Sequence, residues 1–448
     1  MFRFIPNTDD DKKKMLKAIG RSSVDELFFD IPEEIKTKSN MKIPGPLSEI
    51  DIKRHFHDLG NRNMIFRTCF RGAGAYRRYI PSIVNHVISR SEFYTSYTPY
   101  QAEVSQGILQ VIFEYQTMMC ELTGMEVSNA SLYDGATAGA EAVFMAVDLT
   151  GKNRVLLCRT LNPQTRSVIK TYSNFSTARN IRIEEVPYRN GRTDLDVLEN
   201  KMNEEVACVL VQYPNFFGIL EEVIEIEKIV HKHGSFLIVS TDPISLGLLR
   251  SPGELGADVV IGEGQPLGIP LSFGGPYLGF ITTKEKYMRR LPGRIVGESV
   301  DCDGNRGFIL TLQAREQHIR RENSASNICS NHQLNAVAAT VYLTVMGKRG
   351  ISEVANQCLQ KAHYAFEEIL RVDGMKPGFS APFFNEFVIK SDIDPDKINE
   401  FLFKNDILGG HDLSGDFTEL DKHLLYCVTE LNTRREIEML TEALRALK

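Results

Sequence analysis

Two side chains that could bind a ligand stand directly after short apolar runs in the middle of the chain. Asp242 follows the run Phe236–Ser240, and Gln265 follows the run Ala257–Ile261. Loops rich in glycine and proline separate these runs, which is typical of strands bounded by turns. In α/β enzymes, ligands bind at the carboxyl ends of such strands. The spacing therefore predicts a ligand site at this edge of a sheet.

A turn of small residues, Asp134–Gly139, is a second candidate for chemistry. It leads into a predicted helix that runs to about Leu149, and Thr137 lies within it. Small residues let backbone N–H groups approach an anion at a helix N-terminus, where the dipole also favours negative charge. The pattern is typical of a phosphate site, although glycine and alanine can equally serve close helix packing.

Two further stretches carry residues of functional type. The stretch 61–105 is interrupted by glycine and proline and has little periodicity, so we expect an ordered loop, which often carries binding residues. The alternative is that its tyrosines pack at a domain edge. The segment Thr311–Glu322 is basic and could hold an anion, but the favoured interpretation is ion pairing or simple solvation. The residues concerned are Tyr76, Tyr79, Tyr94, Tyr97 and Tyr100 in the first stretch, and Arg315, His318, Arg320 and Arg321 in the second.

The composition excludes several classes of function. A net charge of −6 over 448 residues gives no general attraction to nucleic acid or to anionic membranes. No apolar run approaches the roughly 18–20 residues that span a bilayer, and the charged start does not read as a secretory signal. Eight cysteines occur without a CxxC pair, which favours free thiols in a reducing cytoplasm over disulfides or zinc. We expect a cytoplasmic protein without a metal site.

Hydrophobic periodicity predicts the elements that position these residues. Apolar residues from Ile108 to Leu122 follow the spacing of one helix face, and Gly124 closes that helix. Beyond it, apolar runs alternate with helices, which predicts a mostly parallel sheet covered on both faces. The runs are Arg154–Cys158, Ile181–Pro187, Val206–Gln212, Phe236–Ser240, Ala257–Ile261 and Tyr277–Ile281.

The two ends of the chain differ from this middle part. Residues 1–60 read as short helices joined by proline-rich segments, which cannot build much core alone and so predict an arm. From about residue 350, a smaller α/β unit follows. We therefore expect an N-terminal helical arm with its following loop over 1–80, a large α/β domain over 81–330 and a small C-terminal α/β domain over 331–448.

The order of these features resembles that of the fold-type I enzymes, which use pyridoxal phosphate (PLP). The resemblance implies that fold, with the small-residue turn at the PLP phosphate and Asp242 at the pyridinium nitrogen. It also implies a lysine near Gln265 that holds the cofactor as a Schiff base. No lysine occurs between Lys232 and Lys284, however.

The imidazole that should cover the cofactor ring is missing as well. It is expected after the run Arg154–Cys158, but Arg159–Arg166 contains neither histidine nor an aromatic residue. Within the resemblance, Thr137, Asp242 and Gln265 therefore mark a degenerate PLP site. An autonomous PLP enzyme is disfavoured.

Nearly the whole chain is similar to the N-terminal half of the P-protein family, the glycine decarboxylases of the glycine cleavage system. In that family two related halves or subunits occur, and the lysine-bearing one holds PLP. A chain that ends just after the small domain resembles the separate subunit 1. The segments that carry the resemblance are FYTSYTPYQAEVSQG, YDGATAGAEA, QYPNFFG, DPISLGLLRSPGELGADVVIGEGQPLGIPLSFGGPYLG and TLQAREQHIRRENSASNIC.

The resemblance implies that this chain works with a PLP-bearing subunit 2, in an expected α2β2 heterotetramer. Glycine is decarboxylated, and its aminomethyl group passes to the lipoyl arm of the H-protein. No catalytic residue is expected in this chain alone, and PLP is expected on the partner. The residues expected at the glycine pocket are Tyr94, Thr95, Tyr97, Thr98, Tyr100 and Gln101. Those expected at the partner's PLP phosphate are Ser272, Phe273, Gly274 and Gly275.

Two other interpretations remain open from the sequence. The chain could be an autonomous PLP enzyme with a lysine from elsewhere in the fold. It could also be a non-catalytic scaffold that only stabilises its partner subunit.

Overall fold

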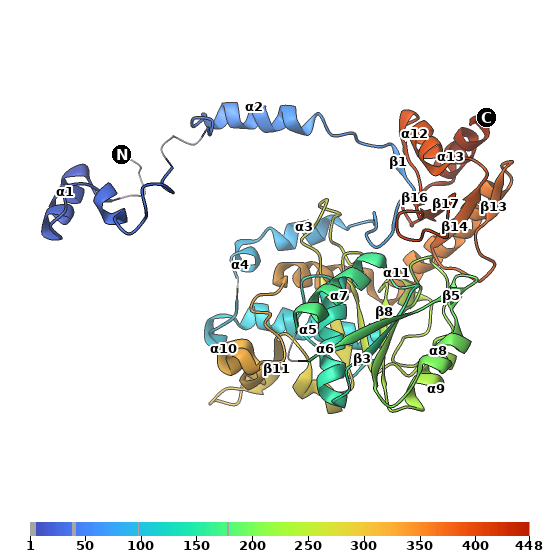
Figure 1. Ribbon diagram of the computed structural model, residues 1–448, viewed down its shortest axis with the longest axis horizontal. Coiled ribbons are helices and arrows are strands. Elements are labelled where there is room, and N and C mark those ends of the chain that lie inside the picture. Colours follow the sequence, from blue (N-terminus) through green and yellow to red (C-terminus); the bar gives the residue numbers. More distant parts are fainter. Residues whose placement is uncertain (1–5, 38–41, 97, 177–178, 448) are drawn as a thin grey trace. The chain divides into compact units, whose positions relative to one another are not determined.

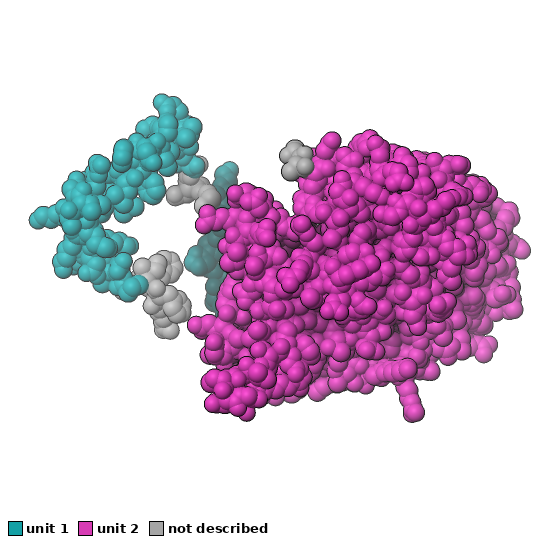
Figure 2. All heavy atoms as spheres, turned by 90° about the horizontal axis from the view of Figure 1, so that it is seen from below, with its two compact units in different colours: residues 1–64 teal, residues 65–448 magenta. Residues whose placement is uncertain are grey.

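The computed structural model describes residues 6–37, 42–96, 98–176 and 179–447 (Figure 1). Contacts divide the chain into two compact units, Met1–Met64 and Ile65–Lys448, coloured teal and magenta in Figure 2. In the described part of the chain, no helix is both long and apolar enough to cross a membrane.

The first unit consists of short helices without a core. They are α1 (Asp9–Ala18), the 3-10 turn η1 (Asp25–Phe28) and α2 (Glu49–Gly60). Thr8 and Ser48 cap α1 and α2 through side-chain oxygens that accept backbone N–H groups of the first turn. Neither α1 nor α2 buries a single residue. Isolated helices of 10 to 12 residues are marginal in water, so these helices gain little stability from their own unit.

The second unit is built on a seven-stranded sheet with the order β2-β10-β9-β8-β7-β3-β4. The five strands from β9 to β4 are mutually parallel, whereas β10 pairs antiparallel with both its neighbours. The predicted mostly parallel sheet is therefore confirmed. The bounds are β2 (Val127–Ser128), β3 (Arg154–Cys158), β4 (Arg182–Val186), β7 (Val206–Gln212), β8 (Phe236–Thr241), β9 (Val259–Glu263) and β10 (Gly279–Thr283).

Helices cover both faces of this sheet (Figure 1). Successive side chains of a strand point to opposite faces, and β3 shows the consequence. Leu156 and Cys158 join the core formed with α5, α9 and α11, whereas Val155 and Leu157 join the core formed with α6 and α7. The bounds are α5 (Gln106–Thr123), α6 (Gly135–Thr150), α7 (Pro163–Phe175), α9 (Val223–His231) and α11 (Gln333–Leu370).

A smaller α/β layer forms the C-terminal part. Its sheet has the order β13-β14-β17-β16 and shares a separate core with α12 and α13. It is joined to the large sheet through α11, whose Gly347 has φ 59° and ψ −179° and so divides the helix at that residue. The bounds are β13 (Met375–Pro377), β14 (Glu386–Ser391), α12 (Pro395–Lys404), β16 (His411–Asp412), β17 (His423–Cys427) and α13 (Arg434–Ala446).

The tyrosine-rich stretch departs from the expected loop. It contains α3 (Ser82–Ile88), α4 (Ser91–Tyr94) and the 3-10 turn η2 (Ala102–Val104). Elements of 3 to 7 residues are too short to produce a recognisable hydrophobic period, which is why the sequence did not predict them.

Candidate functional site

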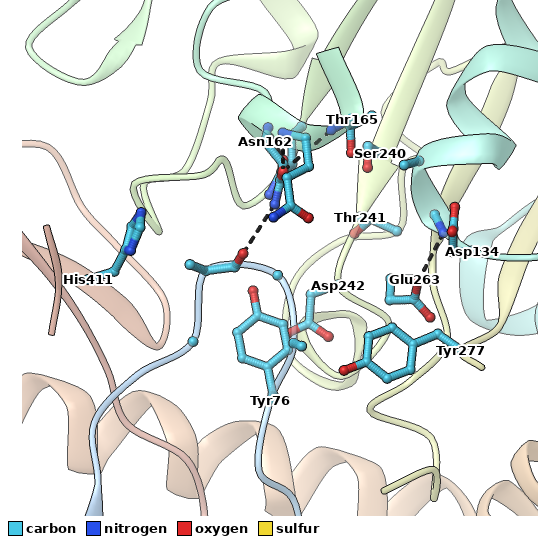
Figure 3. Close-up of a pocket in the computed structure, with 18 of the residues that line it drawn as sticks. Tyr76, Asp134, Asn162, Thr165, Ser240, Thr241, Asp242, Glu263, Tyr277 and His411 are labelled. Atoms are coloured by element: carbon cyan, nitrogen blue, oxygen red, sulfur yellow. Dashed lines mark hydrogen bonds between the residues drawn. The ribbon is translucent and has the colours of Figure 1, made fainter. Parts of the chain in front are cut away.

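A cavity of about 470 Å³ opens at the carboxyl ends of β7, β8 and β9, beside the N-terminus of α6 (Figure 3). This is the edge of the sheet where the sequence predicts a ligand site. Among the described residues that line it, none is a lysine. They include Arg71, Tyr76, Asp134, Asn162, Gln164, Thr165, Gln212, Ser240, Thr241, Asp242, Glu263, Gly274, Tyr277 and His411.

Asp242 is already paired inside the protein. Its Oδ2 lies 3.2 Å from Nη2 of Arg78, and its Oδ1 accepts the Ile244 N–H at 3.0 Å. The Arg78 side chain is only 1% exposed, and its Nη1 also donates to Oε2 of Glu430 at 3.0 Å. Burial raises the pKa of Asp242, and the guanidinium of Arg78 partly offsets this. A carboxylate that is satisfied by an internal cation is not free to pair a cofactor's ring nitrogen.

Gln265 stands where the cofactor lysine is expected, and its amide is fully used. Its Oε1 accepts the Tyr76 N–H at 2.9 Å, and its Nε2 donates to the carbonyls of Tyr76 at 3.0 Å and Ile269 at 2.7 Å. The side chain is buried. Gln265 thus fastens one backbone segment to another, and a carboxamide cannot form a Schiff base.

The segment that Gln265 holds, 71–76, crosses the site, and it belongs to the stretch 61–105 that the sequence predicts as an ordered loop of the kind that carries binding residues. In Figure 3 it is the blue chain beside Asn162, whose Nδ2 donates to the Ala73 carbonyl at 3.2 Å. The Ala73 N–H and the Tyr76 hydroxyl both donate to Glu386, at 2.7 and 2.8 Å. A Cβ on Gly72 would lie 2.4 Å from Oε1 of Glu386, so glycine is required there. The run RGAGA was the available signal for so close an approach.

Two carboxylates occupy the N-terminus of α6, where the phosphate of PLP would lie. Oε2 of Glu263 accepts the Gly135 N–H at 3.0 Å, and Oδ1 of Asp134 accepts the Thr137 N–H at 2.8 Å. Glu263 also accepts N–H groups from Gln265 and Leu278, at 2.9 and 3.0 Å. Burial raises the pKa of Glu263 to about 7. Like charges repel, so this end of the cavity disfavours a phosphate.

The residues of this cavity therefore do not fit PLP. No lysine occurs in its described lining, and Asp242 is paired with Arg78. At the N-terminus of α6, where the phosphate would lie, carboxylates take up backbone N–H groups. Each of the three positions is satisfied by the protein itself.

The described residues expected at the glycine pocket lie outside this cavity. Tyr94 and Thr95 stand at the end of α4, Gln101 precedes η2, and the Tyr100 ring is 71% exposed. The Thr98 hydroxyl is buried without a hydrogen-bond partner among the described residues. None of these side chains lines the cavity. Tyr97 lies outside the described residues.

The loop Leu271–Pro276 touches the cavity and also projects from the surface. Gly274 lines the cavity, whereas the Phe273 side chain is 100% exposed. Ser272 and Phe273 have φ values of +48° and +43°, and Gly274 and Gly275 have +127° and +95°. Four consecutive positive φ values form a strained turn that holds an apolar ring in solvent.

The described residues contain no group of three or more His, Cys, Asp or Glu side chains placed to hold a metal ion.

Comparison with known proteins shows the family of the chain. Residues 2–444 match the model of the family described as glycine cleavage system P-protein. A protein of Desulfitobacterium hafniense named probable glycine dehydrogenase (decarboxylating) subunit 1 is 51% identical over 447 residues, 99% of this chain and 100% of that protein. A Bacillus cereus protein of the same name is 49% identical over 450 residues and covers both chains fully.

Solved structures give the same result. A crystal structure of glycine decarboxylase (P-protein) of the glycine cleavage system, in inhibitor-bound form, superposes with a TM-score of 0.90 at 39% identity, covering 100% of both chains. A sphingosine-1-phosphate lyase from Burkholderia pseudomallei superposes with a TM-score of 0.63 at 13% identity, over 92% of this chain and 93% of that one. The second likeness shows the fold alone.

Proposed function

Because the chain belongs to the glycine cleavage system P-protein family, with the subunit 1 chains of glycine dehydrogenase (decarboxylating), we propose that it serves that enzyme without carrying PLP itself. The family's PLP is held by subunit 2, which this chain completes at a shared active site. Together the two subunits decarboxylate glycine and transfer its aminomethyl group to the lipoyl arm of the H-protein.

The observation that carries the proposal is the ion pair between Arg78 and Asp242. A PLP enzyme needs that carboxylate to hold the cofactor's pyridine nitrogen protonated. Here an internal guanidinium, 3.2 Å away and almost fully buried, takes the place of the ring nitrogen. With this carboxylate already paired, the cavity of this chain lacks the group that would bind the ring nitrogen of PLP.

The contribution of this chain comes from two segments directed outward. The Ser272 hydroxyl and the backbone N–H groups of Ser272–Gly275 bind the phosphate of the partner's cofactor, and glycine permits their close approach. Hydroxyl and amide groups from Tyr94 to Gln101, including Tyr97, line the glycine pocket and donate to its carboxylate. The positive φ values of Ser272 and Phe273, which hold the exposed Phe273 ring outward, support this assignment, because strained backbone of this kind is concentrated at functional sites.

Reconstitution tests the proposal. Purified subunit 1 and subunit 2 should each be inactive in glycine–bicarbonate exchange with lipoylated H-protein, and the mixture should be active. Activity of this chain alone would contradict the proposal.

Substitutions distinguish two roles of this chain, a contribution to a shared active site and the mere stabilisation of its partner subunit. Ser272→Ala and Tyr97→Phe should lower exchange in the mixture while the complex still assembles normally on size exclusion. Unchanged exchange with normal assembly would favour the scaffold interpretation.

A further inference from the structure

A second cavity, of about 270 Å³, lies in the second unit and is lined by four arginines. Arg289 and Arg290 come from the end of the 3-10 helix η4 (Glu285–Arg290). Arg315 ends η5 (Gln313–Arg315), and Arg320 ends α10 (Gln317–Arg320), which is labelled in Figure 1. Two segments separated by more than twenty residues thus bring four cations to one concave surface.

No carboxylate lines this cavity among the described residues. Nor does any of its four arginines form an ion pair with another described residue. Arg315 donates to main-chain carbonyls of Leu291 and Gly293, the latter at 2.7 Å. Arg320 has one long contact, Nε to the Ala314 carbonyl at 3.4 Å. The ion pairs with nearby acids that the sequence suggested for these two arginines are therefore absent from the described structure.

The cavity also holds an unsatisfied donor. Nε of Arg315 is buried and has no hydrogen-bond partner in the described part of the chain. The nearest acid in sequence, Glu316, lies 3.6 Å from Nδ1 of His318 and forms no ion pair with a described arginine, although its charge raises the pKa of Arg315 against the larger lowering by burial. A buried donor without a partner is unfavourable, so a ligand that accepted this hydrogen bond would bind more tightly for it.

Four converging guanidinium groups favour an anion with many acceptor positions. Guanidinium presents its N–H groups as a rigid fork that matches the oxygens of phosphate in two-point contacts. A phosphate group carries nearly two negative charges and three or four acceptor oxygens, whereas a carboxylate carries one charge and two oxygens. A concave pocket of this volume encloses a small ligand, whereas an acidic protein surface would need a flatter face.

We propose that the cavity formed by Arg289, Arg290, Arg315 and Arg320 is a binding site for a phosphate group, either free phosphate or the phosphate of a small ester. The site is separate from the degenerate PLP cavity, with which it shares no lining residue.

Calorimetric titration of the assembled two-subunit enzyme with inorganic phosphate tests the proposal. The enzyme is first saturated with PLP, so that the partner's cofactor site cannot accept the probe. We expect one saturable site per copy of this chain, weakened as salt is raised. The double variant Arg290→Gln/Arg320→Gln should weaken binding at least tenfold. The matched control Arg349→Gln/Arg435→Gln removes two exposed arginines outside the cavity and should bind as the wild type does.

A second titration distinguishes the source of the phosphate. Phenyl phosphate that binds more tightly than inorganic phosphate indicates an ester ligand, and equal or weaker binding indicates the free anion. Absence of saturable phosphate binding by the wild type would overturn the proposal, as would unchanged binding by the cavity variant. If phosphate fails to bind and the cavity variant instead weakens association with the H-protein, the arginines form a protein interface and the proposal is wrong.

Discussion

Arg78 determines the state of the degenerate site. One buried guanidinium serves the carboxylates of Asp242 and Glu430, and its Nη1 also lies 2.8 Å from Sγ of Cys358. Its removal leaves two buried acids without a cation. Breaking a buried pair from one side costs about 3–5 kcal/mol, because the remaining charge stays desolvated.

Arg78→Met should therefore lower the free energy of unfolding of this chain by about 3–5 kcal/mol in urea denaturation. Arg434→Gln breaks an exposed pair with Glu438 and should cost less than about 1 kcal/mol. Equal losses in the two variants would show that the Arg78 cluster contributes no more than a surface pair.

Glu263 makes stability depend on pH. Burial raises its pKa from 4.5 to about 7 in the folded chain. Between these values the folded state keeps a proton that the unfolded state has lost, so the stability that Glu263 contributes is fully present below pH 4.5 and is lost as pH rises to about 7. Glu263→Gln cannot ionise. The difference in unfolding free energy between pH 5 and pH 8 should shrink by up to about 3 kcal/mol.

The control for this titration is Glu204→Gln, at an exposed position. It should retain the pH dependence of the wild type in the same denaturation series. If Glu263→Gln retains it too, the raised pKa of Glu263 is refuted.

At this scale the sequence could predict Asp242 and the missing lysine, because both are read from single positions. It could not predict what replaces the cofactor. The contact from Arg78 to Asp242 spans 164 residues, and that from Gly135 to Glu263 spans 128. Partners so far apart are brought together only by the topology of the sheet. No local sequence pattern predicts such long-range contacts.

The loop Leu271–Pro276 is the element that the proposed function depends on most. Phe273 is fully exposed, so Phe273→Ala should leave the melting temperature of the isolated chain unchanged within about 1 °C. In the reconstituted enzyme the same variant should reduce exchange activity and raise the PLP concentration needed for half-saturation.

Phe175→Ala is the matched control, because that ring is 84% exposed at the end of α7. It should affect neither stability nor activity. Equal activity of the Phe273→Ala and Phe175→Ala enzymes would show that the loop does not contribute to the shared active site.

The strand boundaries show where the hydrophobic pattern of the sequence predicts them correctly and where it does not. The bounds of β3 and β7 agree with the predicted apolar runs, because both strands are apolar over almost their full length. In contrast, β9 begins and ends two residues later than its run. Its last residue, Glu263, pairs with Gly279 in the sheet and buries its carboxylate at α6. An apolar pattern cannot include a charged residue that is buried for such a reason.

The N-terminal arm, residues 1–64, exposes apolar side chains that no core of its own covers. Large apolar side chains are exposed along it, among them Phe29 at 75%, Ile35 at 72% and Phe56 at 66%. Because α1 and α2 bury nothing, deletion of residues 1–64 should leave the melting temperature of the remaining chain unchanged. On size exclusion, the truncated chain should associate more weakly with subunit 2.

Substitution tests the same idea in the full chain. Phe29→Ser/Phe56→Ser should reproduce the weaker association, whereas removal of a charged arm residue such as Lys14→Ala should not. Normal assembly of the truncated chain would contradict a role of the arm in partner binding.

The proposed function requires PLP on subunit 2 and none on this chain. Borohydride reduction of the assembled, PLP-loaded enzyme, followed by digestion and mass spectrometry, tests it most directly. Reduction fixes PLP covalently on the lysine that carries it. We predict phosphopyridoxyl-lysine only in peptides of subunit 2, at one per pair of subunits. A phosphopyridoxyl-lysine in any peptide of this chain would contradict the account.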